Sequence, residues 1–409
     1  MQIVWFLLVV VLAAGLGWSA VMYLTASPQA MSAYAVLSVS LFIALVVLVV
    51  TRFDGWKKLA AAGLLLAAFA GGWLVTNALF LAQEEHRVLP ELNPPPQAAR
   101  DHVAVVYLTH GEPPGYSPMP WVETMREMDA DKAPFIPVPF RPFFFNAFRS
   151  EYLQVGGSPH NDIHEMMLNS VEKTFREDKD TNTRFYIAFL DSNPRPDESV
   201  LRAINDGASR VVLANVFLTI SSHTQAGQEM VEDLNLDAVG VPVCYSEPLW
   251  DSDALKQMFI NRANANLNGS DKANVGVLLV GHGQPKEWDA IYPTQTEQEL
   301  AFREDLVERF VANGYTRENV RLAWMEFKEP NTPDVAAELG ARELEKIFVF
   351  SASISASSLH SLYDTPEAVR AAGIPNSTLV INLDAWNDDP LVIEAIREKI
   401  DRCMQTASN

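Results

Sequence analysis

The sequence predicts an α/β protein made of two similar halves, each with an open parallel sheet, preceded by three transmembrane helices. Three observations lead to this prediction. The first 82 of the 409 residues are strongly apolar. From residue 101 onward, short apolar strands alternate with amphipathic helical stretches, which is the pattern of a parallel sheet covered by helices. A strand that ends in His-Gly occurs twice, as VAVVYLTHGEP from residue 103 and as NVGVLLVGHGQP from residue 274.

The apolar beginning of the chain holds three stretches long enough to cross a bilayer core, at residues 3–23, 34–50 and 59–81. None of them contains Asp, Glu, Lys or Arg, so they offer no path for a proton or an ion and are expected to be anchors. We therefore assign residues 1–82 to a three-helix membrane anchor. The polar, Pro-rich residues 83–100 read as an extended tether.

The loop between the second and third stretches sets the expected orientation. It carries Arg52, Lys57 and Lys58 against a single Asp54, whereas the first loop is uncharged. Cytoplasmic loops carry an excess of Lys and Arg, so this loop is expected in the cytoplasm. Three crossings then place the rest of the chain outside. For a bacterial chain this is a multi-pass protein of the inner (plasma) membrane with a periplasmic C-terminal domain.

The charge and the cysteines exclude two classes of function. The formal net charge is -20, and no basic stripe could neutralise the phosphates of a nucleic acid. The only cysteines are Cys244 and Cys403, so there is no CxxC thiolate metal site. Cys244 lies in an apolar run and is expected to be a buried strand residue. A disulfide to Cys403 stays open if the compartment is oxidising.

The soluble part divides into a first half at residues 101–270 and a second half at residues 271–409. Both halves repeat one order of strands and helices. In the first half, strands are expected at residues 103–108, 184–190 and 210–218, and helices at 162–176 and 197–206. In the second half, strands are expected at residues 275–280, 321–325, 346–351 and 378–383, and helices at 298–313, 332–344 and 389–405.

The first half holds an insertion at about residues 114–160, which includes PFIPVPFRPFFFNAF. The proline spacing argues against a long helix there. Two interpretations stay open. The insertion is an irregular loop packed on the core, or it is an apolar lip that covers a flat hydrophobic ligand or touches the membrane surface.

Each half offers a histidine, a carboxylate and a second histidine, each just past a strand, where open α/β sheets bind ligands. This donor set suits a divalent first-row metal such as Fe, Co, Ni or Zn better than Mg or Ca. Two histidines and a carboxylate also leave coordination positions open for exchange. The sets are His282, Glu326 and His360 in the second half, and His110, Asp191 and His223 in the first.

The remaining histidines have no counterpart in the other half. His86 lies in the tether, and His102, His160 and His164 precede or follow the first strand. All four are expected to be surface residues, with the phrase PHNDIH from residue 159 as a candidate for a metal contact at the rim of the site. None of them joins the predicted metal sets.

Four other residues lie near the predicted sets. Glu329 and Asp364 are candidates for carboxylates that orient a histidine ring. Trp288 and Trp324 are expected to pack structurally, although an aromatic face also stacks well on a planar ligand.

At these residues the chain resembles the class II tetrapyrrole metallochelatases, which include the sirohydrochlorin cobaltochelatases and ferrochelatases. The resemblance covers residues 101–405, as two fused halves behind a membrane anchor. It rests on the strand-His-Gly phrase, the carboxylate before a proline, and a histidine after the third strand. The GxH-like segment that usually precedes the second histidine is altered to TISSH and SASSLH.

The resemblance implies a function in tetrapyrrole chemistry, such as cobalamin or porphyrin synthesis. Such an enzyme inserts a divalent metal (Co²⁺, Fe²⁺ or Ni²⁺) into a tetrapyrrole such as sirohydrochlorin without a nucleotide, and the sequence contains neither a P-loop nor GxGxxG. His282 would be metal ligand and proton acceptor, Glu326 ligand and proton relay, and His360 the second histidine ligand. The alternative is a non-catalytic periplasmic protein that binds haem, another tetrapyrrole or a metal on the same fold.

Overall fold

The computed structural model describes residues 2–133 and 136–406 and separates into two compact units. Residues Met1–Arg87 and Gly115–Gly157 form the first, which we call the anchor unit. Residues Val88–Pro114 and Ser158–Asn409 form the second, which we call the sheet unit. The insertion of the first half thus belongs to the same unit as the apolar helices.

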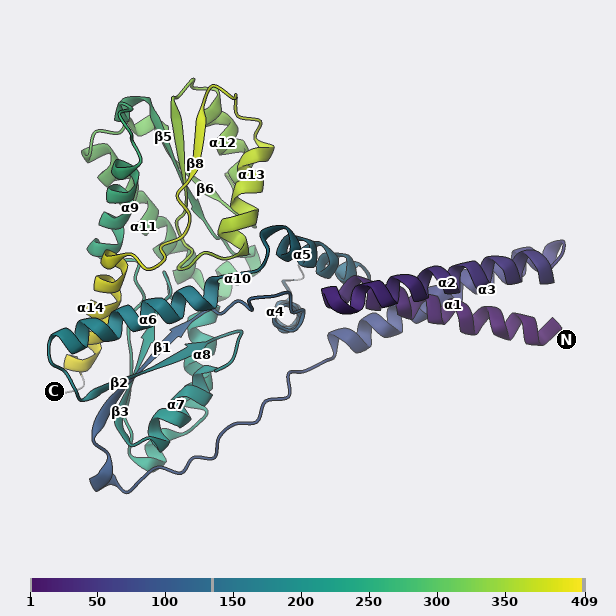
Figure 1. Ribbon diagram of the computed structural model, residues 1–409, viewed down its shortest axis with the longest axis horizontal. Helices are drawn as coiled ribbons and strands as arrows, with labels where there is room; N and C mark the ends of the chain where they lie inside the picture. Colours follow the sequence, from purple (N-terminus) through teal and green to yellow (C-terminus); the bar gives the residue numbers. More distant parts are fainter. Residues whose placement is uncertain (1, 134–135, 407–409) are drawn as a thin grey trace. The chain divides into compact units, whose positions relative to one another are not determined.

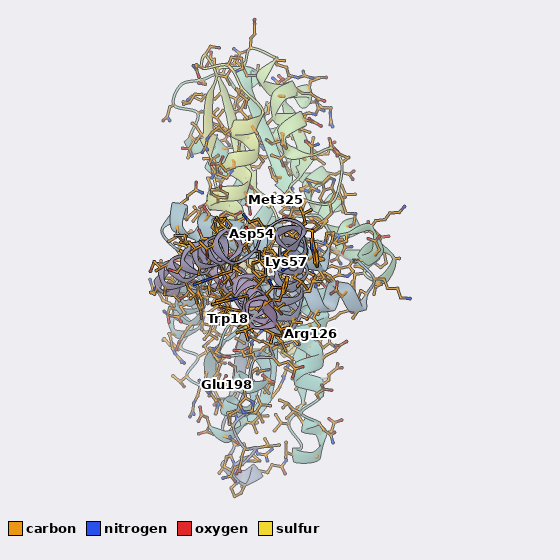
Figure 2. All side chains as sticks on the ribbon, turned by 90° about the vertical axis from the view of Figure 1, so that its right-hand side faces the viewer. Trp18, Asp54, Lys57, Arg126, Glu198 and Met325 are labelled. Carbon is orange, nitrogen blue, oxygen red and sulfur yellow. A yellow bond between two sulfur atoms is a disulfide. The ribbon has the colours of Figure 1, made fainter. Side chains whose placement is uncertain are left out.

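The anchor unit contains three helices that are long and apolar enough to cross a membrane: α1 (Gln2–Thr25), α2 (Pro28–Arg52) and α3 (Trp56–Leu81). Small residues let two of them pack closely, because a Cβ added at Gly72 of α3 would lie 2.2 Å from the Ala14 carbonyl oxygen of α1. Figure 2 looks along these helices and labels Asp54 and Lys57 at the connection from α2 to α3.

The insertion is largely helical, so the expectation of an irregular loop packed on the core is wrong. It forms α4 (Met119–Ala130), a 3-10 turn η2 (Val138–Phe140) and α5 (Arg141–Val155). The prolines end where α5 begins, and Pro142 lies in its first turn, where a missing N–H costs no helical hydrogen bond. Proline spacing therefore delimited the helix rather than preventing it.

The sheet unit contains two four-stranded sheets, and every strand pairing that the structure describes in them is parallel. The strand orders are β2-β1-β3-β4 and β6-β5-β7-β8, so each half has the same topology and the predicted repeat is confirmed. The first sheet consists of β1 (His102–Thr109), β2 (Thr183–Phe189), β3 (Ala208–Asn215) and β4 (Val243–Tyr245). The second consists of β5 (Val275–Gly281), β6 (Val320–Trp324), β7 (Lys346–Ser351) and β8 (Leu379–Asn382).

Helices accompany both sheets (Figure 1). In the first half they are α6 (His160–Glu177), α7 (Pro196–Asn205) and α8 (Ser222–Glu232), followed by α9 (Asp253–Ala265). In the second half they are α10 (Lys286–Ile291), α11 (Pro293–Ala312), α12 (Thr332–Gly340), α13 (Thr365–Ala371) and α14 (Pro390–Thr406), with a π-helical turn η6 at His360–Asp364. Short 3-10 turns lie at Gln97–Ala99, Leu236–Val239, Lys272–Asn274 and Arg317–Asn319.

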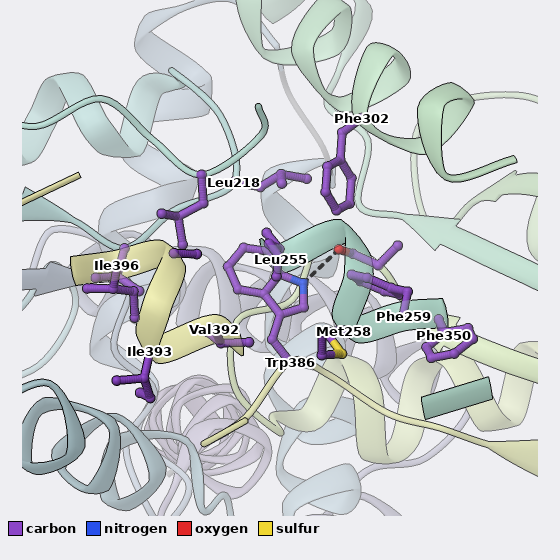
Figure 3. Close-up of a cluster of buried hydrophobic side chains, with 14 of the residues drawn as sticks. Leu218, Leu255, Met258, Phe259, Phe302, Phe350, Trp386, Val392, Ile393 and Ile396 are labelled. Atoms are coloured by element: carbon purple, nitrogen blue, oxygen red, sulfur yellow. Dashed lines mark hydrogen bonds between the residues drawn. The ribbon is translucent and has the colours of Figure 1, made fainter. Parts of the chain in front are cut away.

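The two halves exchange the helix that follows their last strand. Figure 1 shows α9 beside the sheet of the second half and α14 beside that of the first. The Phe259 ring of α9 lies 5.1 Å from that of Phe350 on β7, and Ile396 of α14 joins the same buried cluster as Leu218 (Figure 3). In that cluster the Trp386 indole N–H donates to a carbonyl oxygen 2.8 Å away. The halves therefore share one apolar core.

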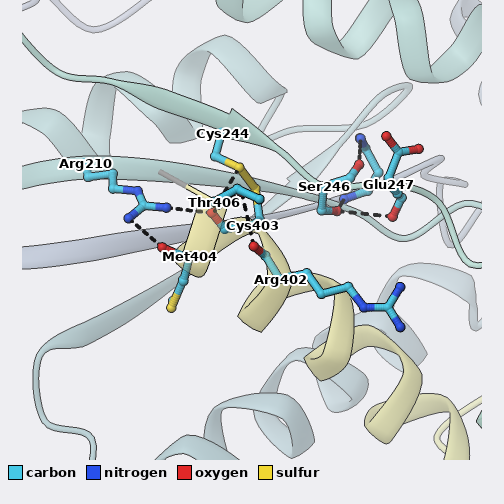
Figure 4. Close-up of a disulfide and its surroundings, with 9 residues drawn as sticks. Arg210, Cys244, Ser246, Glu247, Arg402, Cys403, Met404 and Thr406 are labelled. Carbon is cyan, nitrogen blue, oxygen red and sulfur yellow. Dashed lines mark hydrogen bonds between the residues drawn. A yellow bond between two sulfur atoms is a disulfide. The ribbon is translucent and has the colours of Figure 1, made fainter. Parts of the chain in front are cut away.

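A disulfide joins β4 to α14 (Figure 4). It links Cys244 to Cys403, whose Cα atoms are 6.0 Å apart and which are separated by 159 residues in sequence. Arg210 of β3 supports the same junction, since its guanidinium donates to the carbonyl oxygens of Cys403 and Met404 at 2.7 and 3.0 Å. The sequence left the pairing of Cys244 with Cys403 open, and the structure contains this disulfide.

Candidate functional site

The repeated His-Gly phrase is required by backbone geometry at the ends of β1 and β5. Gly111 and Gly283 have φ values of +100° and +86°, which residues with a Cβ rarely adopt. A Cβ at Gly283 would also lie 2.3 Å from the Glu326 carbonyl oxygen, and one at Gly111 would lie 2.8 Å from the Phe189 Cβ. In both halves, glycine lets the loop that carries the histidine turn tightly against the neighbouring strand end.

The same turn fixes the tautomer of both loop histidines. The Nδ1 atom of His282 lies 2.7 Å from the Gly283 carbonyl oxygen, and that of His110 lies 3.0 Å from the Gly111 carbonyl oxygen. A carbonyl only accepts hydrogen bonds, so Nδ1 carries the proton in each ring. The Nε2 lone pair of each histidine is then the one available to a metal or a proton.

In the second half, His360 lies beside His282, with ring centroids 5.2 Å apart. It begins the π-helical turn, and its Nδ1 donates to the Asp364 carboxylate at 2.7 Å. Burial alone would lower the pKa of His360, but Asp364, Glu326 and Glu112 raise it to about 9. The Glu326 backbone N–H donates to the His282 carbonyl oxygen at 3.1 Å, which brings all three predicted residues of this set into one place.

In the first half, the predicted residues are also neighbours. His110 Nδ1 lies 3.1 Å from the Asp191 carboxylate, and the rings of His110 and His223 are 4.7 Å apart. Asp191 also lies 3.9 Å from the Arg195 guanidinium. The pKa of His223 is held well below its usual value, first by burial and then by the charges of His110 and His282.

Glu112 connects the two sets and was missed in the sequence. Its carboxylate accepts a hydrogen bond from the Leu359 backbone N–H at 3.0 Å, directly before His360. Burial raises the pKa of Glu112, against the lowering effect of its hydrogen bonds and of the charges of His360 and His110. A signal was available, because HGEP and HGQP place Glu112 opposite Gln284, a charge difference inside a matched phrase.

A buried glutamate and a buried arginine of α11 lie beneath the loop of His282 and were also missed. Glu299 of α11 is 2 % exposed, and its carboxylate accepts the His282 backbone N–H at 2.6 Å and the Ser353 hydroxyl. Arg303, one helical turn later, is fully buried, and its guanidinium stacks 3.9 Å over the Trp324 ring. Trp324 packs structurally, as expected. Glu299 thus holds the loop of His282, and the Arg303 guanidinium donates to the carbonyl oxygens of Leu279 on β5 and Ala323 on β6 at 3.3 and 2.6 Å.

Of the two carboxylates expected to orient a histidine ring, Asp364 contacts a histidine and Glu329 contacts the backbone of its own loop. Asp364 contacts His360, as described above. Glu329 instead accepts a hydrogen bond from the Asn331 backbone N–H at 2.8 Å, within its own loop. Trp288 is 7 % exposed and packs structurally, as expected.

The histidine pairs do not form a closed metal cage. Across residues 2–133 and 136–406, no three His, Cys, Asp or Glu side chains are grouped closely enough to hold a metal ion. The structure brings His282 next to His360 and His110 next to His223, while each carboxylate lies alongside its pair. The assignment of these six residues as ligands therefore stays a prediction.

Three histidines expected at the surface are buried, and that expectation is wrong. His102, His160 and His164 are 1 %, 4 % and 0 % exposed, whereas His86 of the tether is exposed. His164 is held by hydrogen bonds on both ring nitrogens, at 2.8 Å to the Tyr107 hydroxyl and at 3.0 and 3.1 Å to two further hydroxyls. The physical reason is that α6 turns His160 and His164 toward the sheet rather than toward solvent, and that His102 is the first residue of the buried strand β1.

We expect the buried histidines to make the sheet unit sensitive to acid. Burial, and then the charge of His110, lowers the pKa of His160 from 6.5 to about 3. Below pH 6.5 the unfolded chain binds a proton there that the folded chain does not, so stability falls as the pH falls toward 3. His160 alone should lose about 2 kcal/mol of stability between pH 7 and pH 5.

The measurement is the free energy of unfolding from denaturant titrations of the full chain in detergent at several pH values. His160→Gln should flatten the slope against pH between 7 and 5, whatever it does to stability at pH 7. His86→Gln, at the exposed tether position, is the control and should leave the slope unchanged. An unchanged slope in His160→Gln would contradict a neutral, buried His160.

Comparisons with known proteins point to one family. The family model described as Ferrochelatase matches residues 141–404. The chain is 24% identical over 265 residues to the ferrochelatase of Gloeothece citriformis (strain PCC 7424), which covers 62% of this chain and 67% of that protein. It is 24% identical over 271 residues to the ferrochelatase of Prochlorococcus marinus (strain MIT 9312), covering 62% and 68%.

Solved structures with a similar arrangement include two chelatases. The structure described as SirB from Bacillus subtilis with Fe3+ has a TM-score of 0.49 and 13% identity, and covers 75% of this chain and 97% of that one. The structure described as CbiX, the terminal enzyme for biosynthesis of siroheme in denitrifying bacteria, has a TM-score of 0.40 and 15% identity, and covers 74% and 98%. The family model spans well over half of the chain, from α5 to α14. This chain belongs to the ferrochelatase family.

Proposed function

We propose that this protein is a membrane-anchored metallochelatase that inserts a divalent metal, iron or cobalt, into a tetrapyrrole such as sirohydrochlorin. The observation that carries the proposal is the pair of Nε2 atoms on His282 and His360. Both rings are anchored through Nδ1, they lie 5.2 Å apart, and both fall inside the matched family region. Imidazole nitrogens with a nearby carboxylate suit first-row divalent metals.

The chemistry requires proton removal as well as metal delivery. A metal that enters a tetrapyrrole replaces two pyrrole N–H protons, and no electron is transferred. His282 would bind the incoming metal through Nε2 and then accept a pyrrole proton at the same atom once the metal has left it. Glu326 would be a further ligand and pass a proton to solvent. His360, whose pKa is raised to about 9, would release its Nε2 proton to solvent before it serves as the second imidazole ligand.

The second half is favoured as the site of insertion. In the first half, Asp191 is already paired with His110 and lies near Arg195, which weakens it as a metal ligand. In the second half, Glu326 is one methylene longer than Asp191. The first set, His110, Asp191 and His223, would then bind metal more weakly beside the main site.

The proposed location is the inner membrane, with the sheet unit in the periplasm. The basic residues between α2 and α3 support a cytoplasmic loop there, which puts the C-terminal ends of α1 and α3 outside. The disulfide between Cys244 and Cys403 supports an oxidising compartment for the sheet unit.

An anaerobic assay of the full chain in detergent tests the proposal. Sirohydrochlorin is added in large excess over protein with Fe²⁺, Co²⁺ or Ni²⁺, and the visible absorption bands are followed. Metal insertion beyond one equivalent per chain, above the rate without protein, supports a chelatase. A band shift that saturates at one equivalent with no metal insertion would contradict it. That outcome supports the alternative, a non-catalytic periplasmic tetrapyrrole or metal carrier.

A further inference from the structure

The Pro-rich segment of the insertion presents large apolar side chains that the described residues of the anchor unit leave about half exposed. Val138, Phe140 and Phe143 are 43 %, 59 % and 53 % exposed. They lie within six residues of one another, on η2 and the first turn of α5. Fully burying side chains of this size is favourable by about 1.5–3 kcal/mol each, so their exposure to water would be costly. The segment needs an apolar environment.

Hydrogen bonds join this segment to the third span rather than to a soluble domain. The Trp73 indole N–H donates to the Pro139 carbonyl oxygen at 3.0 Å, and the Asn77 side-chain amide donates to the Val138 carbonyl oxygen at 2.5 Å. The rings of Trp73 and Phe143 are 5.5 Å apart. The indole N–H of Trp73 and the side-chain N–H of Asn77, two donors of this largely apolar span, therefore find their acceptors on this segment.

The depth of these contacts follows from helix geometry. A hydrocarbon core of about 30 Å takes about 20 helical residues. A core that begins after Lys58, the last basic residue before the apolar run of α3, ends near residue 78. Trp73 then lies about 7 Å inside that boundary at 1.5 Å per residue. The carbonyl groups of residues 138 and 139 meet α3 at the level of the outer hydrocarbon.

The composition of the segment suits this depth. Inside a bilayer, non-helical backbone is tolerated only where its polar groups find partners in the protein. Pro137, Pro139 and Pro142 have no N–H to satisfy. The Phe140 N–H donates to the Pro137 carbonyl oxygen at 2.8 Å, and the Ile136 carbonyl oxygen accepts the Arg141 guanidinium at 3.0 Å. Proline density, which argued against a long helix, also reduces the number of unpaired donors.

The far end of α5 is fixed at the end of the first span. Arg149 is 2 % exposed, and its guanidinium donates to the carbonyl oxygens of Tyr23 and Ala26 at 2.9 and 2.6 Å. A cation at a helix C-terminus offsets the partial negative charge of the last carbonyls. The Tyr116 hydroxyl also donates to the Thr25 carbonyl oxygen at 3.0 Å. The insertion is therefore held at two spans and cannot simply swing away from them.

From these contacts we propose that residues 136–145 form a re-entrant segment embedded in the leaflet at the C-terminal ends of α1 and α3. Its partner is the acyl region of that leaflet, which covers Val138, Phe140 and Phe143. The chain thus enters the membrane twice, once through its three spans and once through this segment. Residues 110–114 and 158–160 connect the insertion to the sheet unit. Both connections therefore lie within a few residues of His110 or His160.

The test uses nitroxide labels on the full chain in phosphatidylcholine–phosphatidylglycerol vesicles. One label is placed at Phe140→Cys, and its matched control at Met166→Cys, a 53 % exposed apolar residue on α6 of the sheet unit. The native cysteines are joined in the disulfide, so only the introduced thiol reacts. Collision rates with oxygen, which dissolves in lipid, and with a polar nickel chelate, which does not, report the depth of each label.

The label at position 140 should collide with oxygen at least several-fold more often, relative to the nickel chelate, than the label at position 166. Equal, water-like ratios at both positions would overturn the proposal. Poor access of both reagents to position 140 would also overturn it, because protein, from this chain or a second copy, would then cover the segment.

A second measurement needs no substitution. A lipid with a diazirine in its acyl chain, photolysed in the same vesicles, should label peptides from residues 136–145 as well as from α1 to α3. The peptide of α6 is the control and should stay unlabelled. Labelling confined to the spans would contradict the re-entrant segment.

Discussion

His282→Ala is expected to lower the rate of metal insertion by about 10²–10⁴-fold, because it removes the proposed metal ligand and proton acceptor together. The substitution leaves the supports of the loop in place, since Glu299 accepts the backbone N–H of residue 282 rather than its side chain. Folding should therefore be retained. The measurement is the initial rate of metal insertion into sirohydrochlorin, with the thermal unfolding midpoint recorded alongside.

His110→Ala is the matched control for this prediction. It occupies the equivalent position in the first half, has the same Nδ1 contact to a glycine carbonyl, and is followed by the same left-handed glycine. We expect the rate of metal insertion to change by less than tenfold in His110→Ala. A large loss in His110→Ala with little change in His282→Ala would move the reaction to the first half. Unchanged rates in both variants would exclude both histidines as metal ligands.

The repeat and its strands were predictable because each strand is a local signal. β5 is buried along its whole length and β1 nearly so, and such strands read as continuous apolar runs. The His-Gly doublets were predictable for a related reason, since a glycine directly after a strand marks a turn. Because the doublet recurs at the same place in both halves, the two predicted sets could be placed at equivalent sheet edges.

The partner of a helix was not predictable in the same way. The sequence predicts the amphipathic helix at α14 but does not predict α9, and an apolar face does not specify which sheet it covers. Each crosses to the other half, and the Cys244–Cys403 pair stays open in the sequence because nothing in the sequence places α14 on the first half. Proline density argues against a helix only up to the start of α5, because Pro142 lies in the first turn of α5 and residues 143–155 contain no proline.

The burial of His160 and His164 had a signal that was not used. They share helical spacing with Met167, Val171 and Phe175, and together these residues form the buried face of α6. Histidine counts as a polar residue in a hydrophobic pattern, so the apolar residues alone mark the buried face of α6 without these two positions. Glu299 and Arg303 were not predicted for a different reason. On a helix with many charges, the sequence alone does not show which pair turns inward.

Loss of the disulfide is expected to have the largest effect on stability. Cys244→Ser should destabilise the sheet unit by about 4 kcal/mol, because the bond closes a loop of 159 residues and so limits the unfolded chain. The bond also joins the exchanged helix α14 to the sheet of the opposite half. Without it, α14 is held by its apolar face and by the hydrogen bonds from Arg210.

The measurement is the midpoint of denaturant unfolding for the full chain in detergent, with and without reductant. The native protein should lose stability on reduction, and Cys244→Ser should not, since it has no bond left to reduce. Cys244→Ser and Cys403→Ser should agree within about 1 kcal/mol. A native protein that is insensitive to reductant would show that the bond contributes little or is absent.

The same two cysteines also decide the orientation of the chain. In intact bacterial cells, thiol alkylation followed by non-reducing electrophoresis should find no free thiol in the native protein and one in Cys403→Ser. Two free thiols in the native protein would mean that the sheet unit faces a reducing compartment, and the orientation drawn from Arg52, Lys57 and Lys58 would be wrong. The chelatase proposal would survive that result, because His282 and His360 act in either compartment. The source of the tetrapyrrole would then be cytoplasmic rather than periplasmic.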